Sequence, residues 1–238
     1  MHNRKVPVHE YILRLFFPPR CISCNVLLSV DTTGVLCRDC EESLPVLKRR
    51  EFTNPAGDST GKVFSAFDYE EGIRWAIHNL KFNDRPGNAA ALVSLALPRV
   101  KQFFFEGQSP CSQVPKYDII IPVPTHFRRK QQRGYNQSEL LAKNLAKQTG
   151  MSVCTKALVK NLNTPPQSSL GRGERLKNLK EAFRVKHPEE ISGKRVLLVD
   201  DVMTTGTTLE QCGRVLIEAG AVHVDAFVIA IRRKNQLT

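Results

Sequence analysis

The chain has 238 residues, enough for one large domain or for one domain of average size with a small appendage. Its 41% hydrophobic content indicates a packed core, and no apolar run reaches the roughly 18 to 20 residues that a transmembrane helix needs. Lys and Arg number 35 against 23 for Asp and Glu, a net charge of +12. This excess favours polyanionic partners, such as nucleic acid, phosphorylated metabolites or an anionic membrane surface, over the alternative that the charge serves solubility alone.

The N-terminal segment MHNRKVPVHEYILRLFFPPRC lacks the long apolar core and the small-residue cleavage site of a signal peptide, so we expect a cytoplasmic protein. Tyr11, Ile12, Leu15 and Phe16 recur at helical spacing, which predicts an amphipathic helix. We expect its apolar face to dock on the protein itself, with a membrane surface as the alternative.

Four cysteines follow in the pattern C-x2-C-x12-C-x2-C, at Cys21, Cys24, Cys37 and Cys40. Each pair directs two thiolates to one point, which is what tetrahedral zinc requires. Disulfides are the alternative, but cytosolic thiols stay reduced. A site with four protein thiolates has no open position, so we predict structural Zn²⁺ in an N-terminal module over residues 1–50.

Residues 51–62 are rich in turn-forming residues and are predicted to be a linker, before a main domain over residues 63–238. There, strands are predicted at 63–69, 117–123, 153–159 and 195–201, with another at the end of the chain. Helices are predicted at 71–82, at 89–105 with a kink or break at Pro98, at 138–149 with Ser138 as N-cap and Gly150 as its stop, and at 207–219. A basic turn is expected at 125–137, and the longest stretch without a period covers 163–178. Alternating strands and helices predict an α/β fold with a mostly parallel sheet covered by helices on both faces.

The stretch VLLVDDVMTTGTTL, from Val196 to Leu209, joins a buried strand to a helix through two acids and a small-residue turn. Only 37 residues follow Asp201, too few for the phosphoacceptor domain of a response regulator, and the Lys-Ser or Lys-Thr pair of a P-loop is missing. Backbone N–H groups and hydroxyls at the positive end of a helix suit a monoester phosphate. Two carboxylates just before them suit sugar hydroxyls or hydrated Mg²⁺, so the stretch predicts a ribose 5-phosphate site.

The same stretch resembles the signature of the type I phosphoribosyltransferases. The cysteine pairs and the segments LKFNDRPG, IIPVPTHFRRKQQRGYNQSELLAK and TPPQSSLGRGERLKNLKEAF also resemble the competence protein ComF family, so that the similarity covers nearly the whole chain. It implies a type I phosphoribosyltransferase fold after a small zinc-binding module, and a role in natural transformation, in the uptake or cytoplasmic handling of single-stranded DNA.

The resemblance also implies roles for individual residues. Asp200 and Asp201 would hold the ribose hydroxyls of phosphoribosyl pyrophosphate, directly or through Mg²⁺-bound water. The 5-phosphate would lie on Thr204, Thr205, Gly206, Thr207 and Thr208. The turn at 124–126 would approach the pyrophosphate, with charge supplied by Lys81, Arg128, Arg129, Lys130 and Arg133. A flexible loop at 164–175 would close over the substrate through Gln167, Arg172 and Arg175.

Several alternatives stay open. The cations at 128–133 are also suited to DNA phosphates or to a solvated face. His126 is suited to a role as base or ligand, although a structural role is favoured. One hypothesis is an uptake factor that binds phosphoribosyl pyrophosphate or DNA without turnover, with DNA-uptake or DNA-processing proteins at the inner membrane as its expected partners. The other is an active phosphoribosyltransferase with an unidentified acceptor. A sequence-specific regulator is disfavoured because no helix-turn-helix is evident.

Overall fold

A computed structural model of the chain describes residues 7–83, 85–106, 114–160 and 182–233. Its centre is a five-stranded sheet in the order β1-β2-β9-β8-β5, built from β1 (Glu51–Thr53), β2 (Lys62–Asp68), β5 (Ile119–Pro122), β8 (Arg195–Met203) and β9 (His223–Ile231). The strands β2, β9, β8 and β5 are parallel, and β1 is antiparallel to β2 at one edge. Among the helices of these residues, none is long and apolar enough to cross a membrane.

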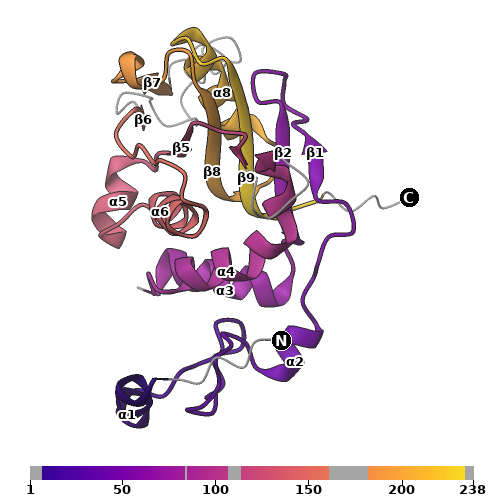
Figure 1. Cartoon of the computed structure of the whole chain (residues 1–238), viewed down its shortest axis with the longest axis vertical. Helices are drawn as coiled ribbons and strands as arrows, with labels where there is room; N and C mark the ends of the chain where they lie inside the picture. Colours follow the sequence, from indigo (N-terminus) through magenta and orange to yellow (C-terminus); the bar gives the residue numbers. More distant parts are fainter. Residues whose placement is uncertain (1–6, 84, 107–113, 161–181, 234–238) are drawn as a thin grey trace, which may run out of the picture.

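Helices cover both faces of the sheet (Figure 1). One face carries α3 (Glu71–Phe82), α4 (Asn88–Val100) and α6 (Gln137–Thr149), and the other carries α8 (Thr207–Glu218). Successive side chains of a strand point to opposite faces, so the apolar run of β8 serves two cores. Leu197 and Val199 pack with the α3, α4 and α6 side, and Val196 and Leu198 pack with the α8 side. The predicted fold class is therefore confirmed.

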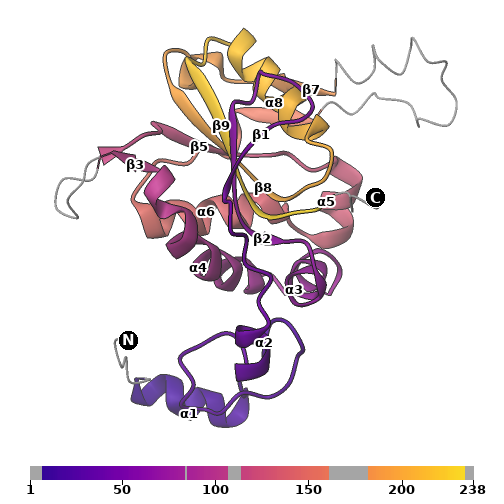
Figure 2. The ribbon, with the colours of Figure 1, turned by 90° about the vertical axis from the view of Figure 1, so that its right-hand side faces the viewer.

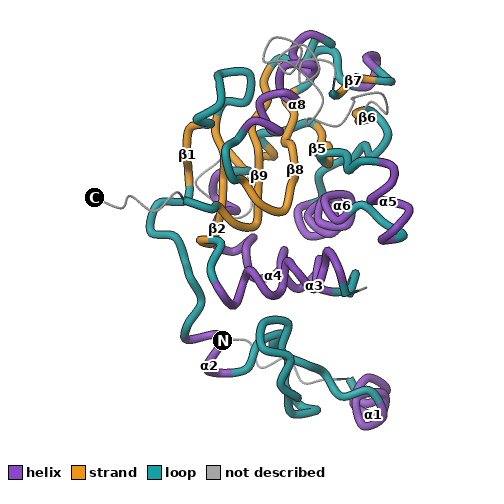
Figure 3. The backbone as a smooth tube through the Cα atoms, turned by 180° about the vertical axis from the view of Figure 1, so that it is seen from behind, coloured by secondary structure: helices purple, strands orange, loops and turns teal. Residues whose placement is uncertain are grey.

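Shorter elements complete the described chain. They are α1 (Val8–Phe16), α2 (Arg38–Glu42), the 3₁₀ helices η1 (Lys101–Phe103) and η4 (Pro188–Glu190), α5 (Phe127–Arg133), and the two-stranded pairs β3 (Phe105–Glu106) with β4 (Val114–Pro115) and β6 (Leu158–Lys160) with β7 (Phe183–Val185). The zinc module, residues 20–45, lies beyond α3 and α4, which separate it from the sheet (Figures 2 and 3).

Several predicted boundaries differ from the structure for local reasons. The basic turn contains α5, because its Arg, Lys and Gln residues favour a helix, His126 caps its start and Gly134 in the left-handed region ends it. The N-cap of α6 is Asn136, which accepts from the backbone N–H of Ser138, while Gly150 ends the helix as predicted. The α-helix through Pro98 continues to Val100, and η1 follows it.

Two other differences concern packing. The strand predicted at 153–159 is reduced to β6, with Val153 bridging Ile120 in isolation. The prediction that the apolar face of α1 docks on the protein itself is wrong for the described side chains, because Ile12, Leu15 and Phe16 are all more than half exposed. Hydrogen bonds from Arg14 to the carbonyls of Val30 and Thr32 attach α1 to the zinc module, away from the body (Figure 1).

The predicted linker at 51–62 is instead an ordered part of the structure. It contributes β1 to the sheet and then supports the start of α8. The buried Asn54 side chain donates to the Gly206 carbonyl at 3.3 Å and accepts from the Ala56 N–H at 3.1 Å. Glu210 of α8 accepts hydrogen bonds from two backbone N–H groups of this segment, and the Thr60 hydroxyl donates to the Leu209 carbonyl at 2.7 Å.

Gly206 shows how closely these parts fit. Its φ of 77° lies in the left-handed region, and a Cβ added there would lie 1.9 Å from Asn54 Oδ1. Glycine is therefore required at this turn both by its backbone conformation and by the approach of Asn54.

We predict that Asn54→Ala lowers the free energy of unfolding by about 1–3 kcal/mol, because it leaves the Gly206 carbonyl and the Ala56 N–H without their partner. Urea denaturation of the purified protein measures the change. Asn144→Ala is the matched control: its side chain bonds the Leu140 carbonyl within α6, where Ala is itself favourable, so little change is expected. Equal midpoints for wild type and Asn54→Ala would show that this contact does not stabilise the turn.

Candidate functional site

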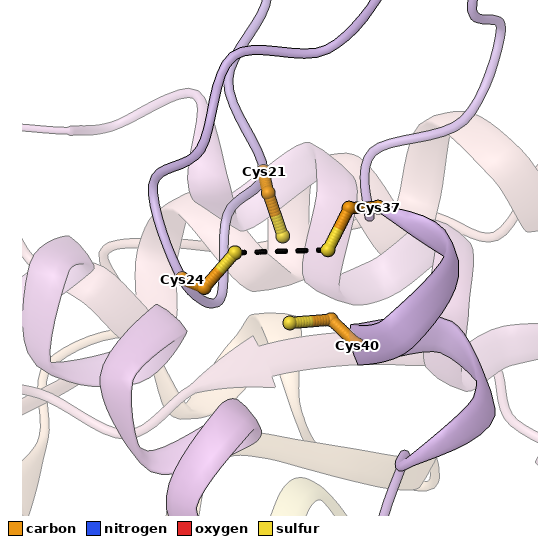
Figure 4. A group of neighbouring side chains, drawn as sticks. All are labelled: Cys21, Cys24, Cys37 and Cys40. Carbon is orange, nitrogen blue, oxygen red and sulfur yellow. Dashed lines mark hydrogen bonds between the residues drawn. The ribbon is translucent and has the colours of Figure 1, made fainter.

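The zinc centre is formed by two short segments of the N-terminal module. Cys21 and Cys24 come from one turn, and Cys37 and Cys40 from the start of α2 (Figure 4). The four sulfur atoms point toward one another and lie within 4.8 Å of one another, with Cys24 Sγ and Cys37 Sγ 3.6 Å apart. A tetrahedral zinc ion with bonds of about 2.3 Å places its sulfurs about 3.8 Å apart, so the cysteines fit structural Zn²⁺.

The zinc module packs against α3. The buried residues Cys21 and Ile22 belong to the same apolar cluster as the α3, α4 and α6 side of the sheet. Arg85 donates to Asn25 Oδ1 at 2.7 Å, which ties the end of α3 to the first cysteine pair. Between the module and α3 lies a groove of about 820 Å³, within the range of ligand sites.

The acidic pair lies near the carboxyl end of β8, which runs two residues beyond the predicted strand to Met203 before the turn into α8. Asp200 Oδ1 accepts from the Ser138 hydroxyl at 2.7 Å and from the Asp201 backbone N–H at 2.9 Å. Asp201 is 4% exposed, and its Oδ1 atom accepts from Lys81 Nζ at 2.8 Å. Asp201 Oδ2 is buried and has no hydrogen-bond partner among the described residues.

The negative charge of the two aspartates is only partly compensated by their neighbours. Burial, and then the negative charge of Asp201, raises the pKa of Asp200 to about 7, although Ser138 and Lys81 act in the opposite direction. A buried carboxylate that accepts few hydrogen bonds favours its neutral form, and a like charge beside it adds to this effect. The site is therefore a place where a cation or a set of hydroxyl donors would relieve an existing cost.

The cations predicted to bind the pyrophosphate lie at different distances from the acidic pair. Lys81, at the end of α3, contacts Asp201 directly in a largely buried ion pair. Arg133 at the end of α5 lies close enough to Asp201 for the carboxylate to raise the pKa of its guanidinium, against the larger lowering by burial and by Arg129. Arg128 and Arg129 are exposed on α5, and Lys130 lies 3.6 Å from Glu139.

The threonine turn presents its polar groups to solvent. The four threonines are exposed, Gly206 is buried, and α8 begins at Thr207. Thr205 Oγ1 and Thr207 Oγ1 lie 3.0 Å apart. Exposed hydroxyls at the first turn of a twelve-residue helix are suited to a phosphate group.

Sequence reasoning missed three residues of this region. Ser138 was predicted as a helix cap, but its hydroxyl bonds Asp200. Asn54 was placed in a linker, but it supports the threonine turn. Lys160, on β6, lies near enough to Asp200 and Arg129 for both to affect its pKa, which burial lowers most. The Asn-Gln-Ser sequence at the start of α6 was the available signal for Ser138, while the other two depend on packing between distant segments.

Other predicted residues have simpler outcomes. His126 Nδ1 accepts from the Arg128 N–H at 3.3 Å as the N-cap of α5, which is a structural role. The predicted loop contacts Gln167, Arg172 and Arg175 lie outside the described residues.

We predict that stability depends on pH through Asp200. Its pKa is raised from 3.8 to about 7 in the folded state, so the unfolded chain ionises first and folding stability is lost as the pH rises between about 4 and 7. Asp200→Asn keeps an acceptor for Ser138 but removes this cost. Without added ligand, the melting temperature of the variant should rise relative to wild type across this range and then level off.

Thermal unfolding at several pH values measures the difference. Glu218→Gln, an exposed acid at the far end of α8, is the control and should follow wild type. A constant difference between Asp200→Asn and wild type at every pH would contradict the raised pKa of Asp200.

The chain matches known proteins in both of its parts. Residues 120–238 match the family described as phosphoribosyl transferase domain, and residues 12–52 match the double zinc ribbon domain. The DNA utilization protein YhgH of Salmonella typhimurium is 34% identical over 168 residues, 71% of each chain. Competence protein F of Haemophilus influenzae is 28% identical over 90% of this chain and 98% of its own, and competence protein ComFC of Bacillus subtilis is 27% identical over 87% of this chain and 76% of its own.

These matches cover the four-cysteine zinc site and the strand, turn and helix that carry the acidic pair and the threonines. The chain therefore belongs to the ComF family, with a zinc ribbon joined to a phosphoribosyltransferase domain.

Proposed function

We propose that the protein binds phosphoribosyl pyrophosphate with Mg²⁺ at the carboxyl end of β8 and acts in natural transformation, in the handling of single-stranded DNA. The main support for this choice of ligand is the junction of β8 and α8. There a pair of acids and a turn of exposed threonines lie next to each other at a helix N-terminus. The acids are suited to the ribose hydroxyls and the turn to the 5-phosphate.

The acidic pair also suits Mg²⁺. Mg²⁺ is usually bound through one or two carboxylates, with water and substrate phosphates completing its shell. Asp201 Oδ2 has no partner among the described residues, and the pKa of Asp200 is raised, so both carboxylates have capacity for a cation. With Mg²⁺ bound, the charge of a pyrophosphate would be neutralised, and the protein's own contribution would come from Arg133, which lies near Asp201.

The DNA role is supported by the printed names of the relatives, DNA utilization protein and competence protein, and by the chain's own charge of +12. Exposed cations on α5, at Arg128 and Arg129, supply phosphate contacts on the side of the ligand site. Binding of phosphoribosyl pyrophosphate with turnover remains the alternative, and release of pyrophosphate on addition of nucleobases or amines distinguishes it.

We predict that calorimetric titration with phosphoribosyl pyrophosphate and Mg²⁺ gives saturable binding to wild type. The combined change Asp200→Asn and Asp201→Asn should weaken it at least tenfold, because ribose hydroxyls and Mg²⁺ lose charged acceptors worth about 1.5–3 kcal/mol each. Glu218→Gln is the control for loss of one negative charge elsewhere. Equal affinity in wild type and the double variant would refute the ribose assignment.

The salt dependence of binding tests whether Arg128 and Arg129 contact DNA phosphates or the pyrophosphate. We predict that a labelled oligo(dT) binds wild type with an affinity that falls linearly with salt on logarithmic axes. Arg128→Gln and Arg129→Gln should each reduce that slope by about 1 if they contact DNA phosphates, without changing affinity for phosphoribosyl pyrophosphate.

Fluorescence anisotropy at several salt concentrations measures the slopes. Lys147→Gln, a basic residue near the end of α6, is the control and should leave the slope unchanged. Weaker binding of phosphoribosyl pyrophosphate with an unchanged DNA slope would place the arginines on the pyrophosphate instead. Absence of oligo(dT) binding by the zinc-loaded protein would exclude direct DNA handling.

A further inference from the structure

We propose that the exposed aromatic face of α3, formed by Trp75, His78 and Phe82 and here called the aromatic ladder, is a stacking surface for the bases of single-stranded DNA. The inference rests on the proposed role in DNA handling and adds the surface that performs it. The three residues have i, i+3 and i+7 spacing, so they share one face of the helix.

The rings form a continuous row. The Trp75 and His78 ring centroids are 5.7 Å apart with edge-to-face geometry, and those of His78 and Phe82 are 4.8 Å apart. The guanidinium of Arg133 lies over the Phe82 ring, 4.7 Å from its centroid, and continues the row onto α5. Arg guanidinium planes and aromatic rings are both surfaces on which bases stack.

Folding does not account for this face. The opposite side of α3 supplies the buried residues Ile73, Ile77 and Leu80, while Trp75 is 56% and Phe82 is 62% exposed. The His78 Nδ1 atom is buried and has no hydrogen-bond partner among the described residues. Trp75 and Phe82, on either side of the half-buried His78, are therefore available to a partner.

The position of the ladder favours a strand over a single base. At Trp75 it borders the groove between α3 and the zinc module, and at Phe82 it reaches Arg133, near the acidic pair. Between its first and last residue an α-helix rises about 10 Å, more than one stacked base requires.

The distribution of charge along α3 indicates the path that a DNA strand would follow. Glu70 and Glu71 lie at the start of the helix and border the groove, as does Arg85, whereas Arg74 lies beside the ladder and Arg133 at its far end. Phosphates are therefore favoured along the path from Trp75 toward Phe82 and α5, where the exposed arginines lie. Exposed rings beside basic side chains are the usual composition of a single-strand binding surface.

The single tryptophan of the chain makes the proposal directly testable. Oligo(dT) of about 20 nucleotides should quench the fluorescence of Trp75, because stacking places a base on its ring. Trp75→Ala and Phe82→Ala should each weaken oligo(dT) binding roughly 5- to 100-fold, measured by anisotropy, since a stacked base typically contributes this much. Trp75→Phe should retain most of the affinity.

Controls separate stacking from other effects. Phe17→Ala removes a 78% exposed aromatic residue outside the ladder and should leave DNA binding unchanged. Zinc content, melting temperature and binding of phosphoribosyl pyrophosphate should be the same in Trp75→Ala and wild type. The slope of log affinity against log salt should also stay the same, because no phosphate contact is removed.

Three results would overturn the proposal. If wild type binds oligo(dT) but the combined change Trp75→Ala and Phe82→Ala has no effect, the ladder is not the DNA surface, and the proposed function stands. If dTMP quenches Trp75 at the same concentrations as oligo(dT), the surface binds a single base. If wild type binds no single-stranded DNA, the proposed DNA role fails together with this inference.

Discussion

The ion pair between Lys81 and Asp201 is the interaction on which the arrangement of this protein depends. Asp201 is almost completely buried at the end of β8, and Lys81 Nζ is 2.8 Å from its Oδ1 atom. Removing one partner of such a pair leaves an uncompensated charge, which costs several kcal/mol. The pair therefore holds the end of α3 against the carboxyl edge of the sheet, and the Tyr135 hydroxyl, bonded to the Leu80 carbonyl at 2.7 Å, holds the α5–α6 junction there as well.

That attachment also orients the exposed side of α3. Because α3 is fixed at its end, its exposed side is also fixed, and Phe82 lies under Arg133. Its other end meets the zinc module, where a Cβ on Gly72 would lie 2.7 Å from Ser23 Oγ. One helix thus joins the zinc centre, the aromatic ladder and the acidic pair. A zinc site with four protein thiolates leaves no open coordination position, which fits a structural role beside α3.

The parts that could be predicted from the sequence are those with local signals. The cysteine spacing, the apolar run of β8 and the glycine after α6 each depend on a few neighbouring residues, and each was found at its predicted place. The contacts that complete the site join distant segments: Ser138 and Asp200 are 62 residues apart, Lys81 and Asp201 are 120 apart, and Asn54 and Gly206 are 152 apart. The periodicity of a sequence carries no information about such pairs. Asn54 was therefore assigned to a linker, and Lys81 was expected to bind the pyrophosphate.

Because Lys81 already pairs with Asp201, it limits how a ligand can contact this carboxylate. A ribose hydroxyl or a hydrated Mg²⁺ that uses Asp201 meets a carboxylate whose Oδ1 atom is already occupied, and so it takes Oδ2 or displaces the ammonium group. Either event changes the electrostatic potential at Arg133. The charge of Asp201 affects the pKa of this guanidinium, which lies over the Phe82 ring. Two ligands that act on one shared network bind with a coupling free energy that is equal in both directions. If both proposed ligands bind, we therefore expect phosphoribosyl pyrophosphate to alter the affinity for single-stranded DNA, and DNA to alter the affinity for phosphoribosyl pyrophosphate by the same factor.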